Sequence, residues 1–310
     1  MTFELTVLGS SSALPTSTKY PAAHVLNVHE RLFLVDCGEG TQMQLRKAKI
    51  KFGKLNHIFI SHLHGDHVFG LFGLLSTFDL LGRKNTITIH GPTGIEKLIN
   101  FYTEQFAPER SFEIKVDVIG HRSEKLVYED KILEITAFPL KHRVPTFGYL
   151  FREKTRPLNI KAHSIQEYNL NYKQISDIKE GKDLVLDTGE KIPNHALTQP
   201  AVKPRSYAYC SDTAVYEKNI PLLSGTDLMY HESTFLDRDK KLARQTGHST
   251  SIQAAEMAKR AGVKQLLIGH FSNRYQNDND FLEEAKTVFE NTHVARELQK
   301  YCVEQERLRE

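Results

Sequence analysis

The 310-residue sequence has few cysteines, no long apolar segment and almost no net charge. Cys37, Cys210 and Cys302 are odd in number, lie far apart and form no CxxC pair. This pattern argues against disulfides and against a cysteine zinc site, and it predicts a reducing compartment, by default the cytoplasm. No apolar run approaches the roughly 18 residues of a membrane span, and the N-terminal residues lack a basic-then-apolar signal. We therefore expect a cytoplasmic protein without a membrane segment.

The charged residues nearly balance, because 41 Lys and Arg face 38 Asp and Glu for a net charge of +3. Composition alone thus says almost nothing about nucleic acid, and any site for a polyanion must be a local patch. With 40% hydrophobic residues the chain has enough apolar material for a sizeable core. Because α/β sandwiches often run past about 250 residues as one unit, we expect a single domain over residues 1–310.

Apolar strand-like segments alternate with helical segments in two halves of the chain. Strands are expected at residues 3–9, 24–38, 57–61, 86–91, 113–120, 126–138, 206–210, 227–233 and 265–271. Helices are expected at 68–82, at about 250–261 and in a polar region from about 279. The capping-box spacing predicts helix starts at three pairs, Thr41 and Gln44, Thr93 and Glu96, and Thr250 and Gln253. Residues 151–205 are polar and irregular, which indicates an insertion before the second half.

The segment from Ser61 to His67 carries three histidines and one aspartate at a strand-to-helix junction. Alternate side chains of an extended segment share a face, so His62 and His64 can bind one metal together. Gly65 permits a sharp turn that directs Asp66 and His67 toward a second metal beside the first. Imidazole and carboxylate are ligands that zinc accepts. A surface histidine cluster is the bland alternative, and this density of ligands disfavours it.

Two complete metal sites need more ligands than this segment supplies. Three further candidates are His142, Asp212 and His270, and each directly follows an apolar strand. Strand ends of an α/β fold meet at one edge, where such folds generally keep their sites. His57 and His90 lie within or at the end of strands instead, so we expect them to be packed or hydrogen-bonded rather than to bind metal.

The HxHxDH signature resembles the metallo-β-lactamase superfamily, which implies a four-layer αββα sandwich. Three further segments resemble ribonuclease Z, the tRNA 3′-processing endonuclease family, namely Asp36–Gln42, Tyr230–Thr234 and Gly247–Thr250. Ser211–Thr213 and Gly269–Tyr275 resemble the later metal motifs of the same family. The matches extend from Leu8 to Tyr275. HxHxDH alone indicates only the superfamily, whereas the ordered set is specific for the family.

The resemblance implies two zinc ions per chain, shared among seven ligands. One zinc would be bound by His62, His64 and His142 and the other by Asp66, His67 and His270, with Asp212 as a bridge between them. It also implies a homodimer that grips precursor tRNA with a protruding arm, for which residues 151–205 are the candidate, and no nucleotide cofactor. Two departures from the family pattern are Lys19-Tyr20, in place of an Arg-Asn pair linked to the CCA end, and an arm without the Gly-Pro pair.

The chemistry implied is hydrolysis of a phosphodiester by in-line attack of water on two metals. Asp66 is expected to orient that water or accept its proton. His248, held by Glu232, is expected to donate a proton to the departing ribose oxygen. Arg274 and Lys19 are candidate phosphate contacts. Asp36 is expected to support the metal ligands rather than bind metal.

The leading hypothesis is an endonuclease that removes the 3′ trailer from precursor tRNA, leaving a 3′-hydroxyl on the tRNA and a 5′-phosphate on the trailer. Two alternatives stay open at this point. One is a hydrolase of small substrates on the same scaffold, such as a phosphodiesterase. The other is a metal-free RNA-binding homologue, which retention of every expected ligand disfavours.

Overall fold

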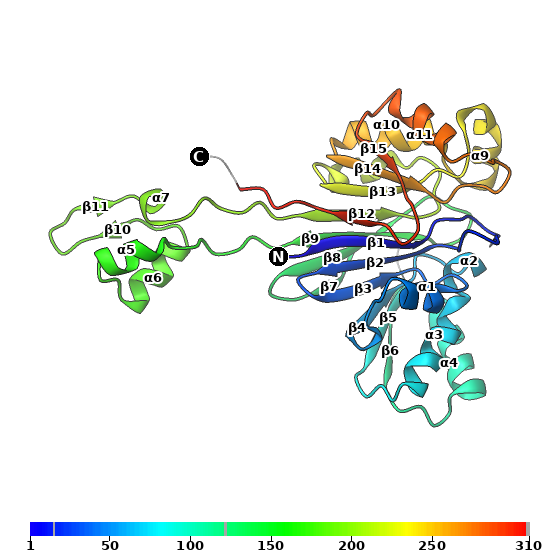
Figure 1. Ribbon diagram of the computed structural model, residues 1–310, viewed down its shortest axis with the longest axis horizontal. Helices are drawn as coiled ribbons and strands as arrows, with labels where there is room; N and C mark the ends of the chain where they lie inside the picture. The colour runs from blue at the N-terminus through cyan, green and yellow to red at the C-terminus, as the bar shows by residue number, and fades with distance from the viewer. Residues whose placement is uncertain (15, 121–122, 308–310) are drawn as a thin grey trace.

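Two sheets packed face to face form the centre of the molecule, with helices on both outer faces (Figure 1). The computed structural model describes residues 1–14, 16–120 and 123–307. Pro15 and His121 therefore lie outside the described residues. The four layers confirm the αββα sandwich predicted from the sequence. No helix within the described ranges is long and apolar enough to cross a membrane.

The first sheet comes from the N-terminal half and one C-terminal strand. Its strands are, in spatial order, β16 (Lys300–Cys302), β1 (Phe3–Gly9), β2 (Ala23–Val28), β3 (Arg31–Val35), β4 (Leu55–Phe59), β5 (Ile87–Pro92) and β6 (Ile114–Ile119). The first four strands pair antiparallel, whereas β3 to β6 pair parallel. Parallel strands need a crossover between them, and helices supply these crossovers.

The second sheet repeats this plan with strands from residues 125–294. Its strands are, in spatial order, β15 (Thr292–Val294), β14 (Gln265–Gly269), β13 (Leu228–Glu232), β12 (Ser206–Cys210), β9 (Phe147–Glu153), β8 (Leu133–Pro139) and β7 (Lys125–Glu129). Strands β12 to β15 pair parallel, and β7, β8, β9 and β12 pair antiparallel. The two halves of the molecule therefore have similar sheets, each with a parallel and an antiparallel part.

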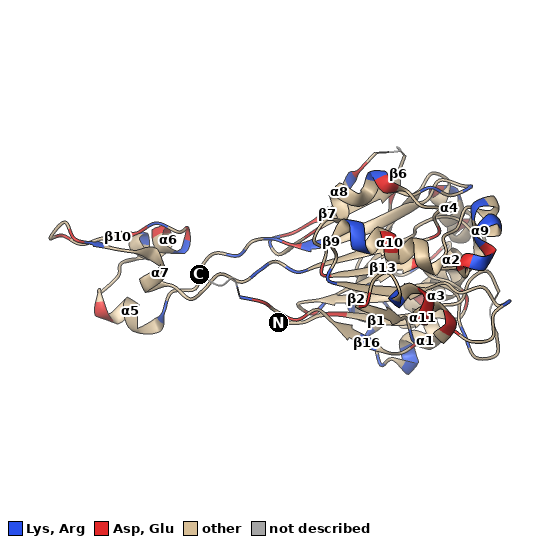
Figure 2. Cartoon of the chain, turned by 90° about the horizontal axis from the view of Figure 1, so that it is seen from above, with Lys and Arg blue, Asp and Glu red and all other residues tan. Residues whose placement is uncertain are grey.

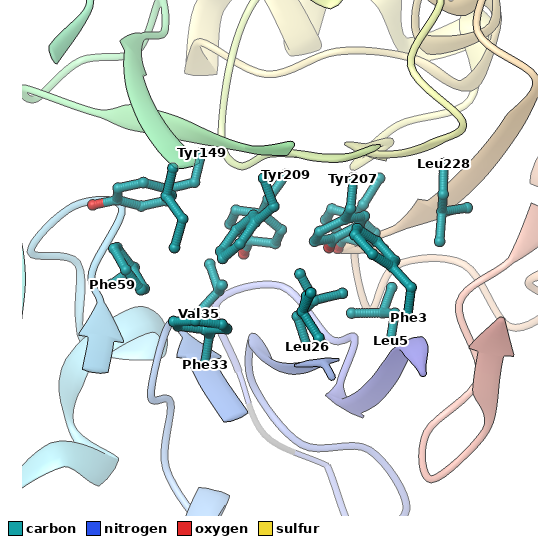
Figure 3. Packing of buried hydrophobic residues seen from close by; sticks show 14 of the residues in the cluster. Phe3, Leu5, Leu26, Phe33, Val35, Phe59, Tyr149, Tyr207, Tyr209 and Leu228 are labelled. Atoms are coloured by element: carbon teal, nitrogen blue, oxygen red, sulfur yellow. The ribbon is translucent and has the colours of Figure 1, made fainter. Parts of the chain in front are cut away.

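Helices cover the outer face of each sheet. The first sheet is covered by α1 (Thr41–Lys47), α2 (Gly65–Val68), α3 (Gly70–Leu80) and α4 (Ile95–Phe106), and η1 (Phe52–Lys54) precedes β4. The second sheet carries η2 (Glu217–Asn219), α8 (Ile220–Leu223), η3 (Asp237–Asp239), α9 (Lys240–Thr246), α10 (Ser251–Ala261) and α11 (Asn279–Lys286). Three apolar clusters fill the spaces between the layers. The central one joins side chains of both sheets, such as Phe33 and Phe59 with Tyr149 (Figure 3).

The helices predicted near Thr41, near Thr93 and at 68–82 are confirmed as α1, α4 and α3, but two predicted caps and the extent of the C-terminal helix were wrong. Gly40 and Gly94, both with positive φ, precede α1 and α4, and neither Thr41 nor Thr93 caps its helix. The helix expected at 68–82 is α3, and α2 is a separate turn that ends at Val68, before Phe69. The polar C-terminal region is helical only over α11, after which the chain returns to the sheets as β15 and β16. The third capping box is confirmed, since Thr250 caps α10 with Gln253.

The insertion between β9 and β12 forms an arm that protrudes from the sandwich (Figure 1). It contains α5 (Ala162–Glu167), α6 (Tyr172–Lys179), β10 (Leu184–Val185), β11 (Lys191–Ile192) and α7 (Asn194–Leu197). A small apolar cluster of its own includes Leu170, Ile178, Leu184 and Leu197. The expectation of an irregular segment was therefore wrong. The polar composition reflects a unit that is mostly surface.

Candidate metal centre

The candidate ligands lie at one edge of the two sheets, each just after a strand. His62 and His64 follow β4, His142 follows β8, Asp212 follows β12 and His270 follows β14. The backbone then turns at Gly65, the first residue of α2, which carries Asp66 and His67. Because the strands of both sheets end at this edge, residues more than 200 positions apart become neighbours. The predicted clustering of these side chains is confirmed.

Three groups of side chains are each close enough to hold one cation. One of them, formed by Asp212, His248 and His270, overlaps the other two, which divide the predicted ligands between them. In the first, ligand atoms of His62, His64, His142 and Asp212 lie within 4.8 Å of one another. In the second, those of Asp66, His67 and His270 do the same. Imidazole and carboxylate at such spacing are the ligand set of a zinc-type divalent cation.

The carboxylate of Asp212 lies between the two groups. Its Oδ2 atom is 3.6 Å from His62 Nε2 and 3.9 Å from His142 Nε2. Its Oδ1 atom is 3.3 Å from His67 Nε2 and 3.2 Å from His270 Nε2. One oxygen therefore faces each group, which is the arrangement of a carboxylate that bridges two cations.

Buried atoms without partners test whether a cation fits. Within the described residues, His67 Nε2, His142 Nε2 and Asp212 Oδ1 are buried and have no hydrogen-bond partner. Buried polar atoms in folded proteins nearly always have a partner, so this concentration at one point calls for a ligand. The residues fit divalent metal ions.

Hydrogen bonds at the Nδ1 atoms orient the imidazoles of the metal centre. His67 Nδ1 donates to Asp36 Oδ2 over 2.7 Å, and His142 Nδ1 donates to the carbonyl of Gly247 over 2.8 Å. His270 Nδ1 lies 3.0 Å from Thr234 Oγ1. Such contacts determine the tautomer, so that the opposite nitrogen, Nε2, is available for a metal.

Asp36 is the centre of this supporting layer. It is fully buried, and its oxygens accept from the backbone N–H and hydroxyl of Ser61 and from the hydroxyl of Tyr209, at 2.7–2.8 Å. The Ser61 hydroxyl in turn lies 3.0 Å from His62 Nδ1. The placement of Asp36 agrees with its expected supporting role.

His248, which is partly exposed, pairs with the fully buried Glu232 beside Asp212. His248 Nδ1 donates to Glu232 Oε1 over 2.9 Å and lies 4.0 Å from Asp212 Oδ2. Glu232 also accepts from three backbone N–H groups, those of Thr213, Thr234 and Ser249, at 2.9–3.0 Å. Burial lowers the pKa of His248, but the carboxylate of Glu232 outweighs it and raises that pKa to about 9.

The carboxylates of the metal centre, Asp66 and Asp212, favour a positive charge between them. Burial by itself raises the pKa of Asp66, yet the imidazoles of His67 and His270 outweigh it and hold that pKa below its usual range. Burial likewise opposes the charge of His67, whose pKa is nevertheless raised by Asp212 and the neighbouring carboxylates. A bound cation would satisfy the same negative groups.

Comparisons with known proteins agree with this geometry. Ribonuclease Z of Bacteroides fragilis is 47% identical over 295 residues, which cover 95% of this chain and 97% of that protein. The chain belongs to the ribonuclease Z family. The crystal structure of the short form of human tRNase Z matches with a TM-score of 0.71 at 27% identity, over 97% of this chain and 99% of that one.

Two further matches concern the fold. The metallo-β-lactamase fold protein YhfI from Bacillus subtilis has a TM-score of 0.68 at 20% identity, over 96% of this chain and 99% of that one. A family model described as anti-Pycsar protein Apyc1 matches residues 3–98. The expected family, the metallo-β-lactamase fold and an endoribonuclease activity are thereby confirmed, and the His/Asp clusters indicate divalent metal binding.

In this member of the ribonuclease Z family, the expected phosphate contacts lie in different environments. Arg274 stacks over the ring of Phe235, with 5.2 Å between its guanidinium carbon and the ring centroid, and Phe235 in turn packs near His248. Lys19 is instead engaged by Asp278, whose two oxygens lie 2.6 and 2.7 Å from its Nζ atom. The positive charge of Lys19 is thus partly neutralised, so Arg274 is the stronger candidate.

The two histidines set aside from the metal centre are hydrogen-bonded, as expected. His57 Nδ1 lies 3.2 Å from His90 Nε2, and His90 Nδ1 is 3.0 Å from Asp117. His90 also stacks on Phe59.

Sequence reasoning missed two contacts of the ribonuclease Z site. The backbone N–H of Ala13 donates to Asp66 Oδ2 over 2.8 Å, and Ala13 has a positive φ of 52°. The Thr234 hydroxyl links Glu232 and His270. Backbone donors leave no trace in residue type, so Ala13 carried no signal. Thr234 is the last residue of the Tyr230–Thr234 motif, and its position two residues after Glu232 was the signal that could have identified it.

Proposed function

We propose that this chain removes the 3′ trailer from precursor tRNA with two zinc ions per chain, leaving a 3′-hydroxyl on the tRNA and a 5′-phosphate on the trailer. The observation that carries the proposal is Asp212, whose two oxygens face two separate groups of buried ligands. One ion would be held by His62, His64 and His142, the other by Asp66, His67 and His270. Such a pair stabilises charge on the attacking and leaving oxygens of an in-line displacement and lowers the pKa of water.

Asp66 would orient the attacking water and accept its proton. Its Oδ2 atom is held by the N–H of Ala13 and lies 3.4–3.5 Å from His270 and His67, so the carboxylate has a single defined orientation. A positioned carboxylate of this kind supplies general-base assistance.

His248 would donate a proton to the ribose oxygen that leaves. Its Nδ1 atom is occupied by Glu232, so Nε2 is the nitrogen available to substrate. Because Glu232 is buried and ionised, it keeps the imidazole protonated near neutral pH. Arg274 stacks on Phe235, whose ring packs near His248, and it would contact a substrate phosphate, with Lys19 as a weaker second contact.

The direction of the strands supports a homodimer. Strand β9 runs from Phe147, near the metal edge, to Glu153 at the base of the arm, and β12 returns from Ser206 to the metal edge. Seven residues of strand span about 23 Å, so the arm begins at the far end of the sandwich and extends away from its own metal centre (Figure 1). An arm that grips tRNA would therefore serve the metal centre of a second copy. A cytoplasmic location, expected from the cysteine pattern, belongs to the same proposal.

Cleavage of a 3′-extended precursor tRNA by the purified zinc-loaded protein tests the function. We expect one cut at the tRNA–trailer junction, loss of cleavage in Asp66→Ala, and two zinc ions per chain by metal analysis. Turnover of bis(p-nitrophenyl) phosphate without cleavage of any precursor would favour the small-substrate alternative. Precursors with and without an encoded CCA should be compared, because Lys19-Tyr20 departs from the family pattern at the loop linked to that end.

A further inference from the structure

A basic strip lies on the outer face of the first sheet, where α1 ends and leads into β4. Residues 41–54 contain five cationic side chains and no acid. These side chains are exposed, and they define the basic strip: Arg46, Lys47, Lys49, Lys51 and Lys54. In a chain whose net charge is only +3, five cations without an acid within 14 residues are a local concentration of positive charge. The other Lys and Arg residues are spread over the sandwich and the arm (Figure 2).

Helix stability does not account for the strip. Cations in the last turn of a helix interact favourably with its dipole, which explains Arg46 and Lys47 at the end of α1. The dipole effect falls off within that turn, whereas Lys49, Lys51 and Lys54 lie beyond it. Neighbouring like charges repel one another, so a cluster of this kind costs stability unless an anion binds.

Few acids neutralise the strip. In the described part of the chain, Glu30 pairs with Lys54 at 3.0 Å, and the other four cations form no ion pair. Lys49 and Lys51 border a hollow of about 200 Å³. The two carboxylates that also line it are already paired, Glu4 with Lys300 and Glu30 with Lys54. The ammonium groups of Lys49 and Lys51 are thus available to a partner.

The strip connects to the metal centre through the loop that precedes β2. Ala13, at the start of this loop, donates to Asp66, and Tyr20, at its end, accepts a hydrogen bond of 3.1 Å from Lys47. Lys47 also lies over the Tyr20 ring at 4.8 Å. A polyanion bound along the strip would therefore extend from the metal edge along the outside of the first sheet.

We propose that the basic strip binds the phosphate backbone of a base-paired RNA stem in the substrate, in addition to the arm. This inference rests on the proposed function, since it assigns a second contact surface to the same substrate. Lysine side chains are flexible and contact phosphates without recognising the base sequence. The strip would therefore increase the affinity for tRNA without discriminating among tRNAs.

Binding of a trailer-free tRNA at several salt concentrations tests the strip without requiring cleavage. Each phosphate contact contributes a slope of about −0.9 to the dependence of log affinity on log salt. We expect the double variant Lys49→Gln, Lys51→Gln to lower that slope by about 2 and to weaken binding roughly tenfold or more at 0.15 M salt. Its turnover of bis(p-nitrophenyl) phosphate should equal that of the wild type, which confirms that the metal centre is intact.

Lys218→Gln with Lys259→Gln is the matched control, because both lysines are exposed on the outer face of the second sheet. This control should keep the wild-type slope and affinity. The proposal would be overturned if the Lys49→Gln, Lys51→Gln variant kept the wild-type affinity for tRNA and the wild-type salt dependence. It would also be overturned if this variant lost binding to anionic vesicles while its tRNA binding was unchanged. Failure of the wild type to cut any precursor would instead refute the proposed function, which the binding assay does not presuppose.

Discussion

Replacing Glu153 by glutamine should loosen the base of the arm. Glu153 ends β9, Arg205 immediately precedes β12, and each is only 3% exposed. The carboxylate accepts from Arg205 Nε at 3.0 Å, from its backbone N–H at 2.9 Å and from a terminal guanidinium nitrogen at 2.8 Å. The guanidinium also donates to the carbonyls of Met1 and Val303. This buried pair thus joins the two sandwich strands that flank the arm to Met1 and to Val303.

The expected loss in free energy of unfolding is about 3 kcal/mol at pH 7, because breaking a buried pair leaves an uncompensated charge. The pH dependence should change as well. Burial raises the pKa of Glu153, but hydrogen bonds from Arg205 outweigh it and lower that pKa to about 2. A depressed pKa contributes stability that is present above the ordinary pKa of about 4.5 and lost as pH falls toward 2. The variant should lack this contribution.

Urea unfolding followed by circular dichroism between pH 3 and 8 measures both effects. Glu129→Gln is the control, because Glu129 pairs with Lys154 at the surface and such pairs contribute at most about 1 kcal/mol. A loss below about 1 kcal/mol in Glu153→Gln, or a pH profile parallel to that of the wild type, would refute the reasoning.

Three other changes test the site and its framework. Asp36→Asn should weaken metal affinity by about 10- to 100-fold, measured by competition with a chelator, because it removes the partner of His67; unchanged affinity would contradict the supporting role. Glu232→Gln should lower precursor cleavage by about 10²-fold or more. Because the raised pKa of His248 depends on Glu232, the activity of the variant should also decline with rising pH at a lower pH than that of the wild type; an unshifted pH–rate profile would count against the pair. Thr250→Ala should cost about 1 kcal/mol of stability in urea unfolding through loss of the α10 cap, whereas Thr250→Ser should cost less.

The residues that carry chemistry were predictable because they are dense and follow recognisable strands. His62 to His67 lie within six residues at the junction of β4 and α2, and strand ends pointed to His142, Asp212 and His270. Local spacing misled where glycine competes with a side-chain cap. Gly40 and Gly94 adopt positive φ, so the chain enters α1 and α4 without a hydrogen bond from Thr41 or Thr93.

The arm was located by composition but misread in its structure. Its short helices and hairpin surround a small apolar cluster. The capping box of Asn171 and Gln174, which begins α6, was the local signal that the sequence analysis missed. The C-terminal strands were missed for a different reason. β15 and β16 are three residues each, and they are strands only because β14 and β1 present free edges to them.

The sequence by itself determined the ligand types, the strand–helix order and the family, since these depend on residue identity and local pattern. Only the tertiary structure decided that each oxygen of Asp212 faces a different ligand group, that Lys19 is engaged by Asp278, and that the arm leaves from the end opposite the metals. These facts arise from contacts between residues far apart in the chain. No local pattern encodes such contacts, because they depend on how the two sheets pack against each other.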